Sequence, residues 1–277
     1  MSRISEMFGR LRGEGKRALI PFITAGDPDL ESTRALLVEL AHSGASLIEV
    51  GVPFSDPIAD GPVIQRSTMR ALRNQVDVAA ILQVVAEARR EIEVPIVLFS
   101  YFNPLLQFGV ERLAKAARRA GVDGVLVTDL AAEESGDFAA VLAIHKVDCV
   151  FLAATTSTDE RLRMIAERAS GFIYAVSRAG VTGERANISS EAEGLVMRLR
   201  NVSDLPIAVG FGVSTRDQVQ EVCRYADAAV VGSAIVAKIE KLSGAPDLAK
   251  QIGSFFQGLL PDRINEATRI SEATARR

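Results

Sequence analysis

The sequence predicts an α/β fold: a single-domain (β/α)8 TIM barrel with an extra N-terminal helix. Eight short apolar runs recur along the chain, segments with helical spacing lie between them, and no Pro/Gly/Ser-rich linker divides the 277 residues. Parallel strands need helical connections, so eight strand-then-helix repeats indicate a barrel or a doubly wound sheet. The count of eight and the even composition favour the closed barrel, and the length suits one of about 250 residues.

The predicted strands are mostly continuous in apolar residues, which is typical of strands buried on both faces. They comprise residues 19–24, 47–52, 96–101, 124–128, 150–154, 172–176, 206–210 and 228–231. Helical spacing is clearest in residues 30–42, 78–91, 111–120, 160–169 and 215–225. Gly44 and Gly121 follow two of these helices and suit left-handed C-caps.

The two ends of the chain add helices to the repeat. Residues 1–12 predict the extra helix, which could cover the bottom of the barrel, and residues 247–260 predict a closing helix. The polar tail from about residue 261 is expected to fray. One domain is therefore expected to span residues 1–277.

Composition excludes several classes of function. The net charge of −3 and the lack of a basic stripe give no reason to expect a nucleic acid partner. No run reaches the roughly 18 apolar residues of a membrane span, and the polar N-terminus does not resemble a signal peptide, so we expect a cytoplasmic protein.

Cys149 and Cys223 are expected to be buried structural thiols, and His42 and His145 are too few for a histidine metal site. No metal is expected.

Glu49 is the first candidate catalytic residue. It lies within the apolar run 47–51, where a carboxylate is costly to bury unless it is paired or protonated. The alternative is a strand edge at which Glu49 points to solvent. An apolar pocket raises the pKa of a carboxyl group, which suits a general acid near neutral pH.

Asp60 is the second candidate. It closes the loop after the same strand, in which Pro53, Pro57 and Pro62 restrict the backbone. Taken alone, the loop could carry solvated aspartates, because Asp-Pro and Asp-Gly are ordinary turn pairs. With Glu49 on the same strand, Asp60 becomes a plausible acid/base partner.

Glycine-rich segments follow the last three predicted strands and indicate a phosphate site. They are residues 180–183, 210–213 and 232–234. Barrels often bind phosphate at the loops after strands seven and eight, with help from a helix N-terminus. Ser233 could cap such a helix and donate its hydroxyl.

These residues resemble the tryptophan synthase alpha subunit family. The resemblance rests on residues 21–28, 47–61, 177–183, 210–214 and 232–236, and it runs in order from about Met7 to about Lys241. The segment from Glu49 through Asp60 to Pro62 is the most specific part. The family implies cleavage of indole-3-glycerol phosphate to indole and glyceraldehyde 3-phosphate, in the biosynthesis of L-tryptophan.

The resemblance also implies roles for individual residues. Glu49 would act as acid and base, Asp60 would stabilise positive charge at the indole nitrogen, and Tyr174 would support the position of Glu49. The indole pocket would be lined by Phe22, Phe99, Leu126, Leu152 and Phe211. The phosphate would be held by Thr182, Gly183, Gly212, Gly232 and Ser233.

The family further implies a partner. No cofactor is expected in this chain, whereas a beta subunit that carries pyridoxal phosphate is expected in an α2β2 assembly. Asp56, in the loop before Asp60, is a candidate for coupling to that partner, and Phe54 could either face the partner or simply hold the loop.

Two positions depart from the family pattern. Ala131 and Ala154 stand where the family usually has proline. Both lie in loops at the predicted active rim. Without proline, we expect these two loops to be less rigid, although no catalytic group is lost.

Two other functions are also compatible with the sequence. A sugar-phosphate isomerase or epimerase would share the glycines of the last strands but would not need the proline-rich loop. A non-catalytic barrel that only activates another subunit would not need both Glu49 and Asp60. No catalytic Ser/His/Asp arrangement is predicted, and no lysine ends a predicted strand, so a Schiff-base aldolase lacks its amine.

Overall fold

A computed structural model of the chain describes residues 2–176, 185–210 and 212–261. The strands are β1 (Ala18–Thr24), β2 (Ile48–Gly51), β3 (Ile96–Ser100), β4 (Gly124–Val127), β5 (Asp148–Ala154), β6 (Ile173–Val176), β7 (Ile207–Gly210) and β8 (Ala228–Val231). They form a closed parallel barrel in sequence order, in which β8 pairs with β1. The predicted (β/α)8 barrel is confirmed, and each strand overlaps its predicted run.

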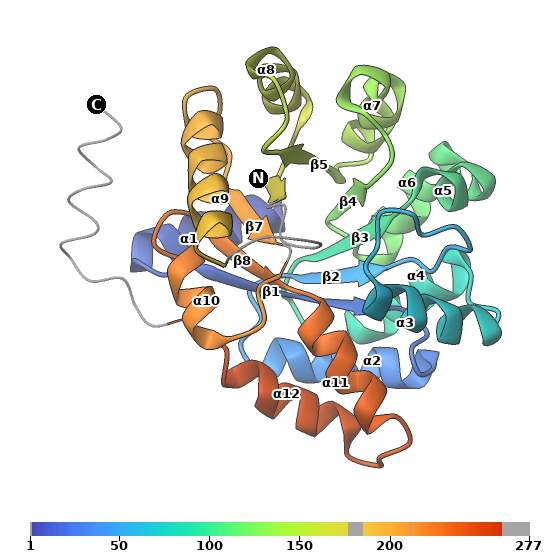
Figure 1. Cartoon of the computed structure of the whole chain (residues 1–277). Coiled ribbons are helices and arrows are strands. Elements are labelled where there is room, and N and C mark those ends of the chain that lie inside the picture. Colours follow the sequence, from blue (N-terminus) through green and yellow to red (C-terminus); the bar gives the residue numbers. More distant parts are fainter. Residues whose placement is uncertain (1, 177–184, 211, 262–277) are drawn as a thin grey trace.

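Helices surround the barrel (Figure 1). In chain order they are α1 (Arg3–Glu14), α2 (Leu30–His42), α3 (Pro62–Arg73), α4 (Val78–Ala88), α5 (Phe102–Phe108), α6 (Val110–Ala120), α7 (Gly136–Ile144), α8 (Asp159–Arg168), α9 (Arg185–Arg200), α10 (Arg216–Val222), α11 (Ser233–Leu242) and α12 (Leu248–Gln257). A short 3-10 helix, η1 (Ala132–Glu134), precedes α7.

Local sequence explains where several helices begin and end. Asp29 and Asp77 precede α2 and α4, and their side chains accept hydrogen bonds from backbone N–H groups of the first turns. Gly121 has φ 85° at the end of α6, and Gly44 has φ 100° just after α2, which confirms the predicted left-handed caps.

The core has two parts. Outward residues of the strands pack against the helices, and inward residues fill the barrel. The predicted N-terminal helix is confirmed: Ile4, Met7, Phe8 and Leu11 of α1 pack into the end of the barrel opposite the predicted site. The predicted closing helix is α12, which packs beside α2. The tail from residue 262 lies outside the described residues.

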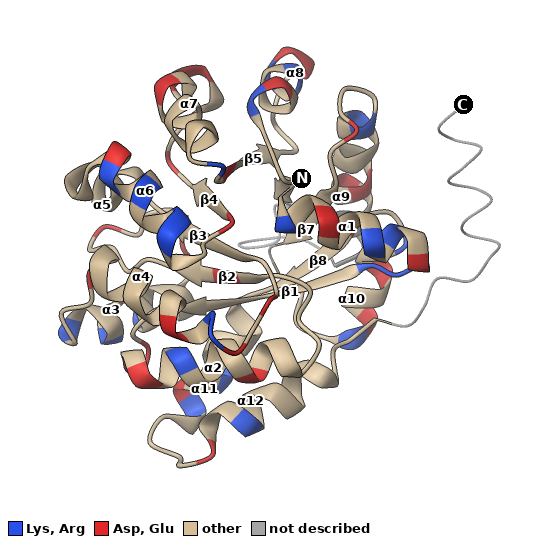
Figure 2. Ribbon diagram, turned by 180° about the vertical axis from the view of Figure 1, so that it is seen from behind, with Lys and Arg blue, Asp and Glu red and all other residues tan. Residues whose placement is uncertain are grey.

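Charged residues lie mainly on the helices and loops, while the strands are almost uncharged (Figure 2). The strands contain two carboxylic acids, Glu49 and Asp148. Asp148 starts β5, and the hydroxyl of Ser2 donates to it. Cys149 and Cys223 are buried, as predicted. In the described part of the chain, none of the helices is both long and apolar enough to cross a membrane.

Candidate active site

Glu49 lies inside the barrel on β2. Its register partners are Phe22 on β1 and Val97 on β3. The residue is 1% exposed, and neither carboxyl oxygen has a hydrogen-bond partner within the described residues. Burial raises its pKa to about 8. The solvent-facing alternative is therefore excluded, and the carboxyl group holds its proton at neutral pH, as a general acid must.

Tyr174 lies across the barrel on β6 and is buried. Burial raises the pKa of its phenol well above the ordinary value, and the negative charge of Glu49 adds to this effect. The phenol and the carboxyl group therefore interact electrostatically, which places Tyr174 in the surroundings of Glu49.

Asp60 ends the loop between β2 and α3 and is half-buried. Burial raises its pKa to about 6, and a hydrogen bond with the Tyr101 hydroxyl opposes this shift. The same hydroxyl accepts a hydrogen bond of 2.9 Å from the backbone N–H of Ala59. Gln65 of α3 donates through Nε2 to the Asp60 carbonyl oxygen at 2.9 Å. Tyr101 and α3 thus hold the end of the loop.

A cleft at the C-terminal end of the barrel brings several of these residues together. It is lined by Phe22, Thr24, Gly51, Val52, Asp60, Ile64, Thr68, Phe99, Ser100 and Tyr101. Three predicted site residues, Phe22, Phe99 and Asp60, are among them. Sequence reasoning missed Thr24 and Tyr101, although each lies where a predicted strand ends.

Aromatic rings form the apolar side of this site. The rings of Phe22 and Phe99 meet edge to face, with centroids 5.4 Å apart, and Phe99 lies 6.4 Å from Tyr174. A β-carbon at Gly51 would lie 2.5 Å from the Phe22 ring. Glycine at this position therefore allows the ring to lie against the backbone of β2. Leu126 is the register partner of Phe99, and Leu152 is that of Tyr174. These surfaces suit a flat aromatic ligand.

Part of the predicted phosphate site is described. Gly232 precedes α11 as its N-cap, Ser233 is the first residue of that helix, and Gly212 has φ 86° after β7. Backbone N–H groups at a helix N-terminus attract anions. Thr182, Gly183 and Phe211 lie outside the described residues, so these predictions stay untested.

The two departures from the family pattern lie at the same end of the barrel. Ala131 has φ −68° and ψ 147°, a conformation that proline also adopts. Ala154 differs, because its backbone N–H donates to the Ser157 hydroxyl at 3.1 Å. A proline at position 154 would remove this hydrogen bond.

A buried acid with a raised pKa and a second carboxyl group, in a closed parallel barrel, are typical of acid–base enzymes of the TIM-barrel class. Comparison with known proteins narrows the class. The family model for the tryptophan synthase alpha chain matches residues 8–258. The chain belongs to this family.

Individual relatives agree. The tryptophan synthase alpha chain of Geobacter sp. (strain M21) is 47% identical over 259 residues, which cover 94% of this chain and 97% of that one. The crystal structure of the alpha subunit from Legionella pneumophila has a TM-score of 0.87 at 34% identity and covers 94% of this chain and 97% of its own. A structure of the α2β2 complex from Pyrococcus furiosus has a TM-score of 0.81 at 40% identity, with coverages of 87% and 97%.

Proposed function

We propose that this chain cleaves indole-3-glycerol phosphate to indole and glyceraldehyde 3-phosphate, with Glu49 as its acid and base. Membership of the alpha chain family supports the reaction. The observation that carries the assignment of Glu49 is its buried carboxyl group, which has no hydrogen-bond partner among the described residues and a pKa of about 8.

Each step of the reaction has a candidate residue. Glu49 gives its proton to C3 of the indole ring, and the positive charge that develops at the indole nitrogen is stabilised by the Asp60 carboxylate. The ionised Glu49 then takes the proton of the C3′ hydroxyl. The C3–C3′ bond breaks as the aldehyde forms, and its electrons return to the ring, which leaves as indole.

The remaining predicted residues bind the substrate. Phe22, Phe99, Leu126 and Leu152 contact the indole ring, while Gly212, Gly232 and Ser233 bind the phosphate. Binding energy from the phosphate, remote from the bond that breaks, helps to position that bond. The family uses no cofactor in its alpha chain, since pyridoxal phosphate belongs to the beta chain.

The test is indole release from indole-3-glycerol phosphate by the purified chain. Glu49→Gln keeps the size of the side chain but cannot exchange the proton, so kcat should fall by about 10²-fold or more. Glu39→Gln, an exchange on the outer helix α2, is the matched control and should leave kcat unchanged. Near-normal turnover by Glu49→Gln would overturn the assignment.

We further propose a beta subunit as partner, in an α2β2 assembly in the cytoplasm, with residues 1–277 as one domain. The related Pyrococcus furiosus protein forms an α2β2 complex with mutual activation, which supports this. A surface cleft lined by Phe54, Asp56 and Pro57 lies beside α3, and Ile58 there is 88% exposed. Phe54 packs on Tyr101 with ring centroids 5.3 Å apart, so it holds the loop.

Asp56 is exposed and accepts a hydrogen bond from the neighbouring Ser55 hydroxyl. A cationic group of the partner could compete for it and draw the loop, with Asp60, into place. Activation by a cognate beta subunit should therefore weaken in Asp56→Asn while basal indole release persists. Equal activation of parent and variant would remove Asp56 from this coupling.

A further inference from the structure

Helix α3, which begins two residues after Asp60, has no large apolar side chain among its buried residues. Its buried residues are Ser67, Thr68 and Ala71. Helix α4, by contrast, buries a face of valine, isoleucine and leucine. Burial of large apolar side chains provides most of the energy that holds a helix against a core. The position of α3 therefore depends more on polar contacts than that of α4 does.

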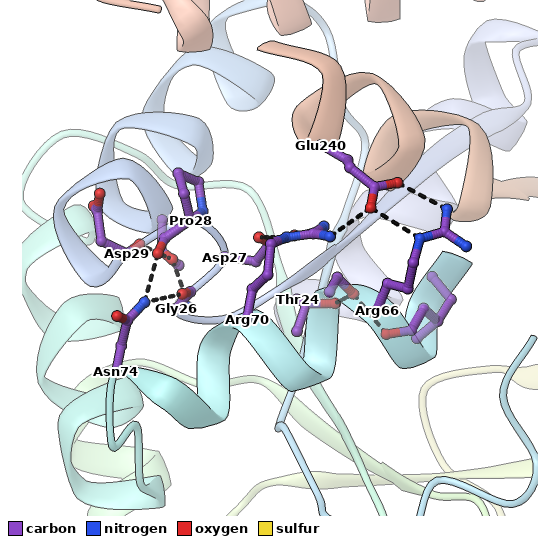
Figure 3. Close-up of polar contacts among 12 residues, drawn as sticks. Thr24, Gly26, Asp27, Pro28, Asp29, Arg66, Arg70, Asn74 and Glu240 are labelled. Atoms are coloured by element: carbon purple, nitrogen blue, oxygen red, sulfur yellow. Dashed lines mark hydrogen bonds and ion pairs between the residues drawn. The ribbon is translucent and has the colours of Figure 1, made fainter. Parts of the chain in front are cut away.

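Arg70 makes three of those contacts, all through its guanidinium group (Figure 3). Its Nε and Nη2 donate to the two carboxyl oxygens of Asp27 at 2.7 and 2.8 Å, and its Nη1 donates to Glu240 at 2.7 Å. Asp27 is 2% exposed and lies in the loop after β1, whereas Glu240 lies on α11. One guanidinium group thus joins three separate elements of the barrel. Its planar fork suits this task, which a lysine cannot reproduce.

Weaker contacts flank Arg70 on both sides. Arg66 pairs with Glu240 at 2.8 and 2.9 Å but is half-exposed, so it contributes little. Asn74 donates to the carbonyl oxygens of Gly26 and Pro28, and the hydroxyls of Thr24 and Ser67 lie 2.7 Å apart. All of these contacts attach α3 to β1, its loop or α11 (Figure 3).

Arg70 joins helices α3 and α11, and the N-terminus of each helix lies at a different part of the candidate site. Helix α3 begins at Pro62, two residues after Asp60, with Gly61 as its N-cap, and Gln65 of α3 donates to the Asp60 carbonyl oxygen. Ser233 begins α11 at the predicted phosphate site. Ile235, Val236 and Ile239 of α11 are buried, so apolar packing holds α11 more firmly than it holds α3.

We propose that Arg70 is a positioning residue for the reaction: by joining Asp27 and Glu240 it sets the place of α3 and thereby of Asp60. This inference rests on the proposed function. In this role Arg70 itself does not contact the substrate. Loss of the fork should leave the phosphate end of the site in place but move the carboxylate that acts in the transition state.

Arg70→Lys tests this, because it keeps a positive charge beside buried Asp27 while removing the fork. We expect kcat for indole release to fall by about tenfold or more, the scale for a small misplacement of a catalytic group, while KM stays within about threefold. Arg89→Lys is the matched control. Arg89 pairs with the equally buried Asp123, whose carboxylate also accepts from the N–H of Ile96 at the start of β3, and this variant should lose stability but keep its kcat.

A double-mutant cycle separates positioning from general destabilisation. If Arg70 acts through Asp60, then Arg70→Lys should have no further effect on kcat in an Asp60→Asn background. Equal losses in both backgrounds, or unchanged kcat in Arg70→Lys alone, would overturn the proposal. Failure of the parent chain to release indole would instead overturn the proposed function, so the two failures are distinguishable.

Discussion

The phenol oxygen of Tyr174 occupies the space that a β-carbon would take at Gly210. Tyr174 lies on β6, and Gly210 is the last residue of the neighbouring strand β7. Glycine at this position leaves room for a buried phenol close to Glu49. The backbone of one strand therefore determines where a side chain of the next can lie.

Gly210→Ala should displace Tyr174 and disturb Glu49. We expect kcat to fall by about tenfold or more, with a loss of stability of about 1–3 kcal/mol from overpacking. Indole release and thermal unfolding measure the two effects. Gly194→Ala in α9 is the control, because a β-carbon there meets nothing within 4 Å. If the two variants show the same kcat and the same thermal stability, Tyr174 accommodates the added methyl group without loss of activity or stability.

The buried carboxyl group of Glu49 should make stability depend on pH. Its pKa is about 8 in the folded chain and 4.5 as a free side chain, so the folded state binds the extra proton between these values. Stability therefore falls as pH rises from about 4.5 to about 8. Glu49→Gln removes this dependence, and its melting temperature should exceed that of the parent by more at pH 8 than at pH 5. A difference that does not change with pH would contradict the assigned protonation.

The activity should also depend on pH in a specific way. The reaction needs an ionised Asp60 and a protonated Glu49. The plot of kcat/KM against pH should therefore be bell-shaped, with an acid limb near pH 6 and a basic limb near pH 8. The Tyr101 hydrogen bond lowers the pKa of Asp60, so Tyr101→Phe should move the acid limb above 6 and leave the basic limb in place. An acid limb that stays near 6 would show that another group titrates there.

Gly212 should be needed for phosphate binding. Gly212→Leu should raise KM for the phosphorylated substrate sharply and abolish protection against heat by inorganic phosphate. Gly244→Leu is the control for backbone strain, since Gly244 also has φ 86° and lies between α11 and α12. Protection that persists in Gly212→Leu would place the phosphate site elsewhere.

The two alanines at family proline positions should respond differently to proline. The backbone of Ala131 already fits, so Ala131→Pro should be neutral or stabilising by about 0.4–1 kcal/mol. Ala154→Pro removes the hydrogen bond to Ser157 and should destabilise the chain by about 1 kcal/mol or more. Denaturant unfolding of both variants compares them, and a reversed order would contradict this interpretation.

Much of the fold follows from short-range patterns in the sequence. The apolar run around Glu49 predicts a buried strand, and a lone carboxyl group within it predicts an acid with a raised pKa. Helix α2 begins after Asp29 and ends at His42, as its spacing and capping predict. These features depend on neighbours in the chain.

The polar network of Arg70 could not be predicted in the same way. Asp27 and Glu240 lie far from Arg70 in sequence, and nothing in their neighbourhoods marks them as its partners. Tyr101 was missed for a similar reason, because its hydrogen bond to Ala59 depends on how the loop folds back over β3. Contacts of this kind arise from the closed barrel.

Helix α1 gives the barrel a floor. Its buried side chains close one end of the packed barrel interior, and the centroid of the Phe8 ring lies 5.9 Å from that of Phe172, two residues before Tyr174. Substrate entry and product exit are then expected at the same mouth, beside the loop that carries Asp60. A partner seated over that mouth would receive indole directly and keep this apolar molecule from escaping into the surrounding water.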